Sequence, residues 1–372
     1  MRVSAYPKEL SAYLIRGDWM RRNRLSVFVS LATTVLFSTL SNAKSKPLQV
    51  YAIDVEGGQS TLIVSPSGQS LLIDTGWPGN KGRDADRIVA AAKSAGLKQI
   101  DYVLITHFHR DHVGGVPQLA RRFKIGTFID HGPNLEDSND PKQDYAAYER
   151  VLPGHKHLVV KPGDHVPIKG IDVLVLTAAG EHIQQPVHGA GTPNPACADE
   201  PKPKADDTEN SRSLGTLITY GKFRMLDLGD LTKDKELELM CPDNLIGTVD
   251  LFIVSHHGWN QSNSNAFVAA IHPKAAIMNN GARKGGSPDV WTIVNNVVGP
   301  NRFWQLHYSS EGGAERNVPE KFIANPDEKN DQCKDIKVVA QKDGAFDVIN
   351  SRNDFQWHYN LKLEMTLSGA AK

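Results

Sequence analysis

The hydrophobic positions of this 372-residue chain change their spacing from segment to segment, which predicts an alternation of strands and helices. Short apolar runs rich in branched residues, bounded by Gly, Pro, Asn or Asp, indicate strands. Apolar residues at intervals of three and four indicate amphipathic helices. In the first half these patterns predict strands at 48–54, 60–64, 71–74, 101–105, 126–130 and 171–176, a helix at 84–95 and a second helix opening at 115–120.

The second half repeats this alternation after residues 183–209, where Pro, Gly, Ala, Lys and Asp predict a loop or flexible insertion. Two similar halves with strands before helices predict an α/β fold, a four-layer αβ/βα sandwich. Short strand patterns in residues 318–359 predict a small C-terminal β appendage. The strands predicted in the second half are 214–220, 223–228, 251–255, 275–278 and 302–307, and the helices are 233–240, 265–271 and 289–297.

The amino-terminal residues have the pattern of an export signal. A basic segment starts at Met20, an apolar run occupies residues 25–40, and small residues precede Lys44. The alternative is a membrane anchor, but the run is short for a span and contains several hydroxyl side chains. We therefore predict a periplasmic or secreted protein without a stable membrane span in its mature chain. The predicted divisions are an export region at 1–43 (with Met20 as an alternative start), a main domain at 44–312 and the appendage at 313–372.

Charge and cysteine content narrow the choice of partners only slightly. The chain has 42 basic and 42 acidic side chains, and residues after position 43 keep 36 basic and 40 acidic ones. Proteins that bind polyanions usually carry a basic face. The charge therefore does not favour nucleic acid as a partner, although a local patch remains open. Export would permit one disulfide among Cys197, Cys241 and Cys333, and the sequence does not assign the pair.

The largest group of candidate metal ligands lies directly after the predicted strand 101–105. His107, His109, Asp111 and His112 occur within six positions, at a strand end where α/β proteins place functional residues. Imidazole and carboxylate ligands together suit zinc, manganese or iron. The spacing indicates that the two alternate histidines face one metal ion, whereas the adjacent Asp-His pair turns toward a second.

These residues match the His-x-His-x-Asp-His motif of the metallo-β-lactamase-fold hydrolases. The sequence also resembles this family at three other predicted strand ends, one before the motif and two after it. Those places are Asp74-Thr75-Gly76, Gly229-Asp230 and His256-His257-Gly258. A narrower resemblance is to the extracytoplasmic hydrolase domain of DNA-uptake competence channel proteins. The segments that carry it are 53–60, 210–214 and 255–258.

The resemblance implies roles for the motif residues. Asp230 would bridge two metal ions, and His256 or His257 would complete the second site, with His256 ranked first because it follows the strand directly. The histidine that the family usually supplies to the first metal after strand 171–176 is missing. Glu181, His182 or water could replace it, and a one-metal enzyme remains open. The implied metal ligands are His107, His109, Asp111, His112, Asp230 and one or both of His256 and His257, with Asp111 also moving protons in catalysis.

The predicted function is that of an exported metal-dependent hydrolase that uses a metal-bound hydroxide, with phosphodiesters as the favoured substrates. The alternatives are a β-lactamase or lactonase, and a non-catalytic module that binds metal or ligand. We expect one or two divalent ions, with zinc the first choice and manganese or iron also compatible, and a small-molecule ester or phosphoester substrate. The residues predicted to hold the ligands or to line the site are Asp74, His131, His182 and His307.

Overall fold

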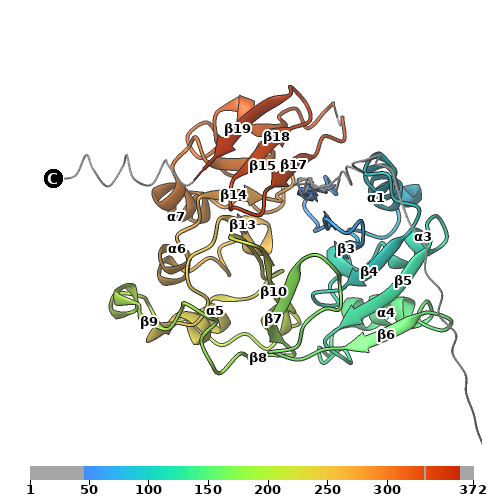
Figure 1. The fold of residues 1–372 in the computed structure, drawn as a ribbon, viewed down its shortest axis with the longest axis horizontal. Coiled ribbons are helices and arrows are strands. Elements are labelled where there is room, and N and C mark those ends of the chain that lie inside the picture. Colours follow the sequence, from blue (N-terminus) through green and yellow to red (C-terminus); the bar gives the residue numbers. More distant parts are fainter. Residues whose placement is uncertain (1–45, 331, 361–372) are drawn as a thin grey trace, which may run out of the picture. The chain divides into compact units, whose positions relative to one another are not determined.

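The computed structural model describes residues 46–330 and 332–360, and Ser45–Lys372 is one compact unit of the chain. The predicted export region, residues 1–43, lies outside the described residues. Two large sheets, flanked by helices, make up this unit (Figure 1). None of the helices within residues 46–330 and 332–360 has the length and apolarity of a membrane span.

The first sheet has nine strands in the order β19-β18-β17-β1-β2-β3-β4-β5-β6. Its strands from β19 to β3 pair antiparallel, whereas β3, β4, β5 and β6 run parallel. The bounds are β1 (Leu48–Ala52), β2 (Thr61–Val64), β3 (Ser70–Ile73), β4 (Ile100–Leu104), β5 (Ile125–Asp130), β6 (Lys156–Val159), β17 (Ile336–Ala340), β18 (Phe346–Asn350) and β19 (Phe355–Tyr359).

The second sheet has eight strands in the order β16-β15-β14-β13-β11-β10-β7-β8. Strands β11, β13, β14, β15 and β16 are parallel, and β10, β7 and β8 add antiparallel neighbours. The bounds are β7 (Asp172–Ala178), β8 (Glu181–His182), β10 (Gly215–Tyr220), β11 (Phe223–Asp227), β13 (Leu251–Ile253), β14 (Ala275–Met278), β15 (Phe303–His307) and β16 (Ile323–Asn325), with β9 (Thr192–Pro193) and β12 (Asp243–Asn244) as a separate pair.

Apolar side chains cover both faces of inner strands such as β2, β3, β13 and β14, which explains why these strands read as nearly continuous hydrophobic runs. In β1, Leu48 and Val50 point into the core between the sheets, and Tyr51 joins the cluster beneath helix α1. The helices on the first sheet are α1 (Arg83–Ser94), α2 (Arg110–Val113), α3 (Val116–Ala120) and α4 (Asn139–Glu149), and those on the second are α5 (Lys233–Met240), α6 (Asn265–Ile271) and α7 (Pro288–Val298). The predicted four-layer sandwich is therefore confirmed.

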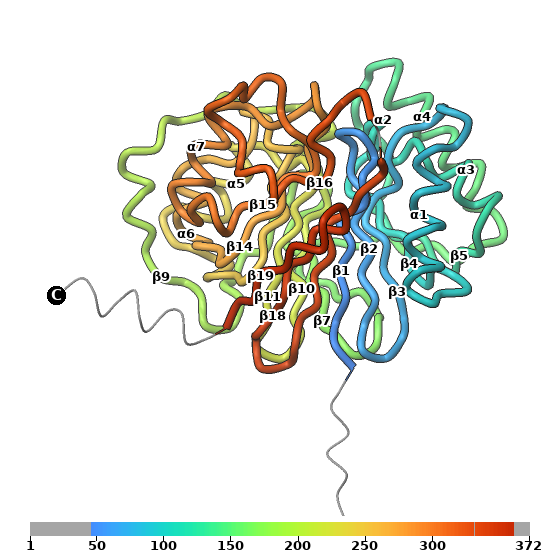
Figure 2. The backbone as a smooth tube through the Cα atoms, turned by 90° about the horizontal axis from the view of Figure 1, so that it is seen from above, coloured from blue at the N-terminus to red at the C-terminus, as the bar shows by residue number. Residues whose placement is uncertain are grey.

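The predicted C-terminal strands are present and continue the two sheets. Strand β16 pairs with β15 in the second sheet, and β17 pairs with β1 in the first, with Leu48 opposite Ala340. Figure 2 shows the red C-terminal strands of the first sheet beside the blue β1. A ring contact between Phe346 and Tyr359, whose centroids lie 4.5 Å apart, supports the outer pair of strands.

The loop prediction for residues 183–209 needs one addition. The segment contains β9 and a short 3-10 turn, Pro195–Ala198, and a disulfide joins Cys197 in this turn to Cys241 after α5. The polar stretch 132–150, for which the sequence pattern predicted no element, contains α4. This helix was missed because its buried residues, Pro141, Asp144 and Tyr148, do not form an apolar stripe.

Candidate metal centre

The candidate metal centre lies where strands of both sheets end. Strands β3 and β4 of the first sheet lead to Asp74 and to the histidine motif, and β11 and β13 of the second lead to Asp230 and to the turn Ser255–Gly258. In each pair the neighbouring strands are parallel, so their carboxyl ends meet at one edge. Polar side chains that follow the strands can therefore converge on one point.

Four buried groups form the centre of this site. The Nε2 atom of His112 lies 3.2 Å from Oδ2 of Asp230, 3.2 Å from Nε2 of His257 and 3.4 Å from Oδ2 of Asp111. The same Asp111 oxygen is 3.1 Å from Nε2 of His257. One ligand atom from each residue lies within 4.8 Å of the others. Two imidazoles and two carboxylates at this distance form a donor set suited to zinc or a similar divalent ion.

Asp230 lies at the middle of a wider ring of histidines. Its Oδ2 atom is 3.4 Å from Nε2 of His256, 3.5 Å from Nε2 of His257 and 3.9 Å from Nε2 of His107. Its other oxygen, Oδ1, is buried and has no hydrogen-bond partner among the described residues. A buried carboxylate oxygen without a donor costs free energy, so this atom fits a metal ligand.

His107 and His109 extend the site on the side of the first predicted metal. Nε2 of the fully buried His107 has no hydrogen-bond partner among the residues described, whereas its Nδ1 lies 3.0 Å from Oγ1 of Thr106. Nε2 of His109 lies 3.0 Å from Oε2 of Glu136, which leaves Nδ1 as its second ring nitrogen. The ring centroids of the two histidines are 4.7 Å apart. Each histidine thus has one nitrogen held by the protein and one left for a ligand.

His256 and His257 both reach the site, but they face different neighbours. His257 belongs to the four-group cluster with Asp111, whereas His256 contacts Asp230 and Oγ of Ser262, 3.3 Å from its Nδ1. The geometry therefore favours His257, rather than the first-ranked His256, as the partner of Asp111. Both histidines have left-handed backbone conformations, with φ values of 54° and 55°. Such conformations cost about 1–3 kcal/mol each in non-glycine residues and cluster at functional sites.

Asp74, which the sequence predicts to hold a ligand histidine, contacts His112 and Thr106. Its Oδ2 accepts hydrogen bonds from Nδ1 of His112 at 2.7 Å and from Oγ1 of Thr106 at 2.7 Å. Its Oδ1 accepts from the backbone N–H of Thr106 at 2.8 Å. This arrangement places the ring proton of His112 on Nδ1 and turns its Nε2 lone pair toward Asp230 and Asp111.

Burial and neighbouring charges shift the pKa values of the central residues in opposite directions. Burial lowers the pKa of His107 well below its usual value and that of His256 to about 4. Burial alone would raise the pKa of Asp230 and lower that of His112. Their mutual attraction outweighs it, so the pKa of Asp230 falls well below its usual range and that of His112 rises well above it. Ionised carboxylates and uncharged histidines such as His107 and His256 are the forms that bind metal ions, whereas His112 would have to release its second ring proton when metal binds.

The other predicted residues lie outside this cluster. His131 is behind the motif, with its Nε2 3.1 Å from Oε2 of the buried Glu209 and its ring centroid 4.8 Å from that of Phe108. His307 binds Asp54, with 2.7 Å between Nε2 and Oδ1, in a group that also includes Glu56. His307 therefore joins the ends of β15 and β1.

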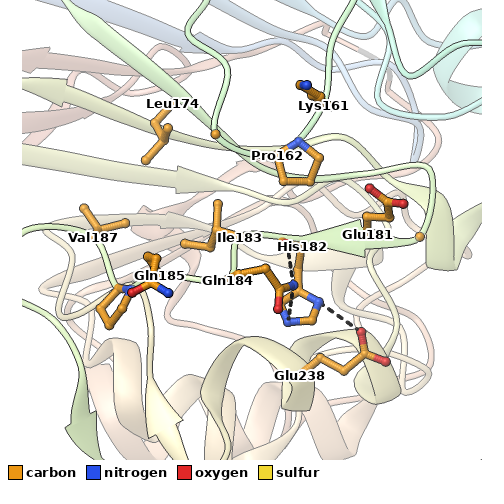
Figure 3. A pocket seen from close by; sticks show the side chains of 13 residues that line it. Lys161, Pro162, Leu174, Glu181, His182, Ile183, Gln184, Gln185, Val187 and Glu238 are labelled. Carbon is orange, nitrogen blue, oxygen red and sulfur yellow. Dashed lines mark hydrogen bonds and ion pairs between the residues drawn. The ribbon is translucent and has the colours of Figure 1, made fainter.

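His182 and Glu181 form the short edge strand β8, where they line a pocket of about 820 Å³ (Figure 3). Nδ1 of His182 lies 3.3 Å from Oε2 of Glu238 in α5. The structure thus gives His182 another partner. Ser213 contacts His107 at the nitrogen that Thr106 also contacts, with its Oγ 3.4 Å from Nδ1.

Two charged residues at the site were missed from the sequence. Lys284, in the loop after β14, contacts Oδ2 of Asp111, and Glu136 holds His109. Glu136 keeps a pKa of about 2, because its hydrogen bond with His109 stabilises the carboxylate. The only sequence signal for Lys284 is its position between glycines in residues 281–286, and Glu136 has none in its polar segment.

Residues 53–198 match the family model of the metallo-beta-lactamase superfamily. Together with the sandwich and the site, this match shows that the chain contains a metallo-β-lactamase domain with the fold of that superfamily, a fold that binds divalent metals.

Among curated proteins, the chain is similar to "ComE operon protein 3" of Bacillus subtilis (strain 168), with 26% identity over 277 residues, 70% of this chain and 32% of that protein. It is also similar to "Recombination protein 2" of Haemophilus influenzae, with 25% identity over 75% of this chain and 30% of that protein. These are competence proteins, so the narrower resemblance is confirmed. The chain spans about a third of the length of both relatives.

Among solved structures, the metallo-beta-lactamase fold protein YhfI from Bacillus subtilis matches with a TM-score of 0.42 and 13% identity, over 68% of this chain and 93% of that one.

Proposed function

We propose that this protein is a metal-dependent hydrolase of esters or phosphoesters, with phosphodiesters as its favoured substrates. The observation that carries the proposal is the position of Asp230, whose Oδ2 lies within 3.9 Å of four imidazole nitrogens from His107, His112, His256 and His257. A carboxylate at the centre of so many imidazoles, with its other oxygen unpaired among the described residues, fits a bridge between metal ions.

The residues of the chain divide the work of the reaction. His107, His109 and Asp230 would hold one divalent ion, and Asp111, His112, His257 and Asp230 a second. Bound metal would polarise the substrate and lower the pKa of water. Asp111 faces the centre through Oδ2 and can accept a proton from the attacking water and return it to the leaving group. Asp74 keeps the Nε2 lone pair of His112 directed inward.

The relatives support hydrolysis, and the longer matches favour one substrate class over the others. One curated protein with 28% identity over 35% of this chain is named hydroxyacylglutathione hydrolase, which describes a hydrolase. The two longer matches are to competence proteins, and these favour a phosphodiester over a β-lactam or a lactone. A non-catalytic binding module with part of the metal site is the remaining alternative.

We also propose that the protein acts outside the cytoplasm. Its amino-terminal pattern supports this, and the disulfide between Cys197 and Cys241 is a bond that persists in oxidising compartments.

One experiment separates these possibilities. The purified protein is analysed for metal content and assayed on a generic phosphodiester, a lactone and a β-lactam. Turnover of the phosphodiester with bound metal supports the proposal, and exclusive turnover of one of the other substrates replaces it with that activity. Bound metal without turnover of any substrate favours the binding module. A His107→Ala, His109→Ala double variant should lose metal, and an unchanged stoichiometry would refute this ligand assignment.

A further inference from the structure

Lys284 places a positive charge inside the candidate metal centre. Its Nζ atom forms an ion pair with Oδ2 of Asp111, and its side chain is 24% exposed. The ammonium also lies over the ring of Trp77, 4.9 Å from the ring centroid. Lys284 therefore contacts a buried carboxylate, and at the same time its ammonium makes a cation–π contact with a partly exposed tryptophan ring.

The oxygen that binds Lys284 is the one that faces the histidines. Oδ2 of Asp111 lies 3.1 Å from Nε2 of His257 and 3.4 Å from Nε2 of His112. A divalent cation held by these three residues would need the same oxygen. Two cations on one carboxylate oxygen repel each other, so the ammonium and a metal ion compete for Asp111.

The surrounding backbone is shaped to admit Lys284. A Cβ atom at Gly57 would lie 3.0 Å from Cβ of Lys284, and one at Gly58 would lie 2.5 Å from the backbone oxygen of Asp111. The glycine pair in the turn after β1 therefore leaves the room in which the lysine, Trp77 and Asp111 approach one another. This close approach explains why residues 57 and 58 are glycines: a side chain at either position would collide with the site.

The loop that carries Lys284 is also tied to the histidine turn. The backbone N–H of Gly286 donates to the carbonyl of His257 at 2.9 Å, and that of Ser287 donates to the carbonyl of Gly258 at 2.9 Å. Within the loop, the N–H of Gly281 donates to the carbonyl of Lys284 at 2.9 Å. The backbone of Lys284 is thus held in place, and only its long side chain needs to move between partners.

From this geometry we propose that Lys284 exchanges partners when metal and then substrate bind. It pairs with Asp111 before metal is bound, and it leaves this oxygen when a divalent cation takes it. The released ammonium then binds a negatively charged oxygen of the substrate, a phosphoryl or carboxylate group next to the reacting bond. This inference rests on the proposed function and adds to it that the substrate is an anion at the position nearest Trp77.

The first test measures metal affinity, which does not depend on turnover. Metal-free protein is titrated with zinc against a chromophoric chelator for the parent, Lys284→Met, Lys284→Arg and the control Lys274→Met. Lys274 precedes β14, whereas Lys284 follows it, and Lys274 forms an ordinary ion pair with Asp250 at 2.9 Å. Lys284→Met should bind zinc roughly tenfold more tightly, a gain between those expected for exposed and buried ion pairs. The control should match the parent.

The second test measures binding of anions to the zinc-loaded proteins. Phenylphosphonate and benzoate are titrated separately, so that the stronger ligand identifies a phosphoryl or a carboxylate group. Lys284→Met should weaken the preferred anion roughly tenfold, and Lys284→Arg should restore most of the affinity because it keeps the charge. Lys284→Gln serves as a second neutral variant, and thermal midpoints confirm that each protein is folded.

The outcomes distinguish this inference from the proposed function. If the parent binds zinc and Lys284→Met binds it equally well, the competition for Asp111 is refuted and the hydrolase proposal stands. Equal anion affinities in parent and variant refute the role in substrate binding. If the parent binds no divalent metal, both proposals fail.

Discussion

Replacing Asp230 by asparagine should damage the centre more than the same change at Asp74. Asparagine keeps the shape of the side chain but removes the negative charge from the point where four imidazole nitrogens lie within 3.9 Å. Two unit charges about 4 Å apart interact by about 4 kcal/mol at an effective dielectric constant of about 20. We therefore expect Asp230→Asn to weaken zinc binding roughly a thousandfold, since each tenfold change corresponds to about 1.4 kcal/mol.

Asp74→Asn acts on the metal indirectly, through His112 and through Thr106, which contacts His107. The Oδ2 atom that accepts from Nδ1 of His112 at 2.7 Å becomes either an amide nitrogen or a weaker, uncharged acceptor. The ring then loses part of its preference for the tautomer with a free Nε2. Changes in such supporting partners typically cost about 10–100-fold in metal affinity or activity.

The assay compares both variants with the control Asp227→Asn, by chelator competition for zinc and by turnover at saturating metal. Asp227 is buried three residues before Asp230, and burial raises its pKa to about 6, but its Oδ1 binds Gln59 and the backbone of Gly229. The control should stay within a few fold of the parent. Near-parental zinc affinity and rate in Asp230→Asn, together with loss of both in Asp74→Asn, would show that Gly229-Asp230 is an ordinary turn and that the metal centre is misassigned.

Three further predictions concern export and stability. Mass mapping of the cell-envelope fraction should find a mature amino terminus near Lys44, and an intact segment from Met20 in the cytosol would contradict export. Removing the Cys197–Cys241 disulfide by double serine substitution should lower the unfolding free energy by up to about 4 kcal/mol, because it spans 44 positions; unchanged thermal unfolding under oxidising conditions would count against this. Burial, aided by the charge of Asp54, raises the pKa of Asp335 from 3.8 to about 7, so the folded state favours the protonated acid. The parent should therefore lose stability relative to Asp335→Asn as the pH rises from about 4 to 7, by at most about 4 kcal/mol, with no further change above that range. Denaturant unfolding of both proteins gives the free energy of unfolding at each pH, and a constant difference between the two proteins would refute the claim.

The order of strands and helices could be predicted from the sequence because the inner strands of both sheets are covered on both faces. Full cover makes strands such as β3 and β13 continuously apolar, and it gives α1 its stripe of Ala85, Ile88 and Ala92. The missed helix α4 shows the limit of the method. Its contact with the sheet depends on Tyr148, which donates to Asp130 at 2.7 Å, and one buried tyrosine makes no periodic pattern.

The sequence by itself determined the local part of the centre. His107, His109, Asp111 and His112 lie in one loop and one short helix, so their spacing alone brings them close together. Strand ends at Asp74 and Asp230 could also be recognised, because a polar residue after a buried strand stands out. Local geometry is encoded by neighbours along the chain, and such neighbours are visible in a sequence.

Only the tertiary structure decided which distant groups meet this loop. It brought His257 rather than His256 to Asp111, gave His182 to Glu238, and placed Lys284 on the central carboxylate. These contacts depend on β14 lying beside β13 and on the two sheets facing each other across their shared core. Packing of apolar faces fixes that arrangement, and it thereby sets the positions of the polar side chains at the strand ends. The pattern of the polar residues alone therefore could not predict these pairs.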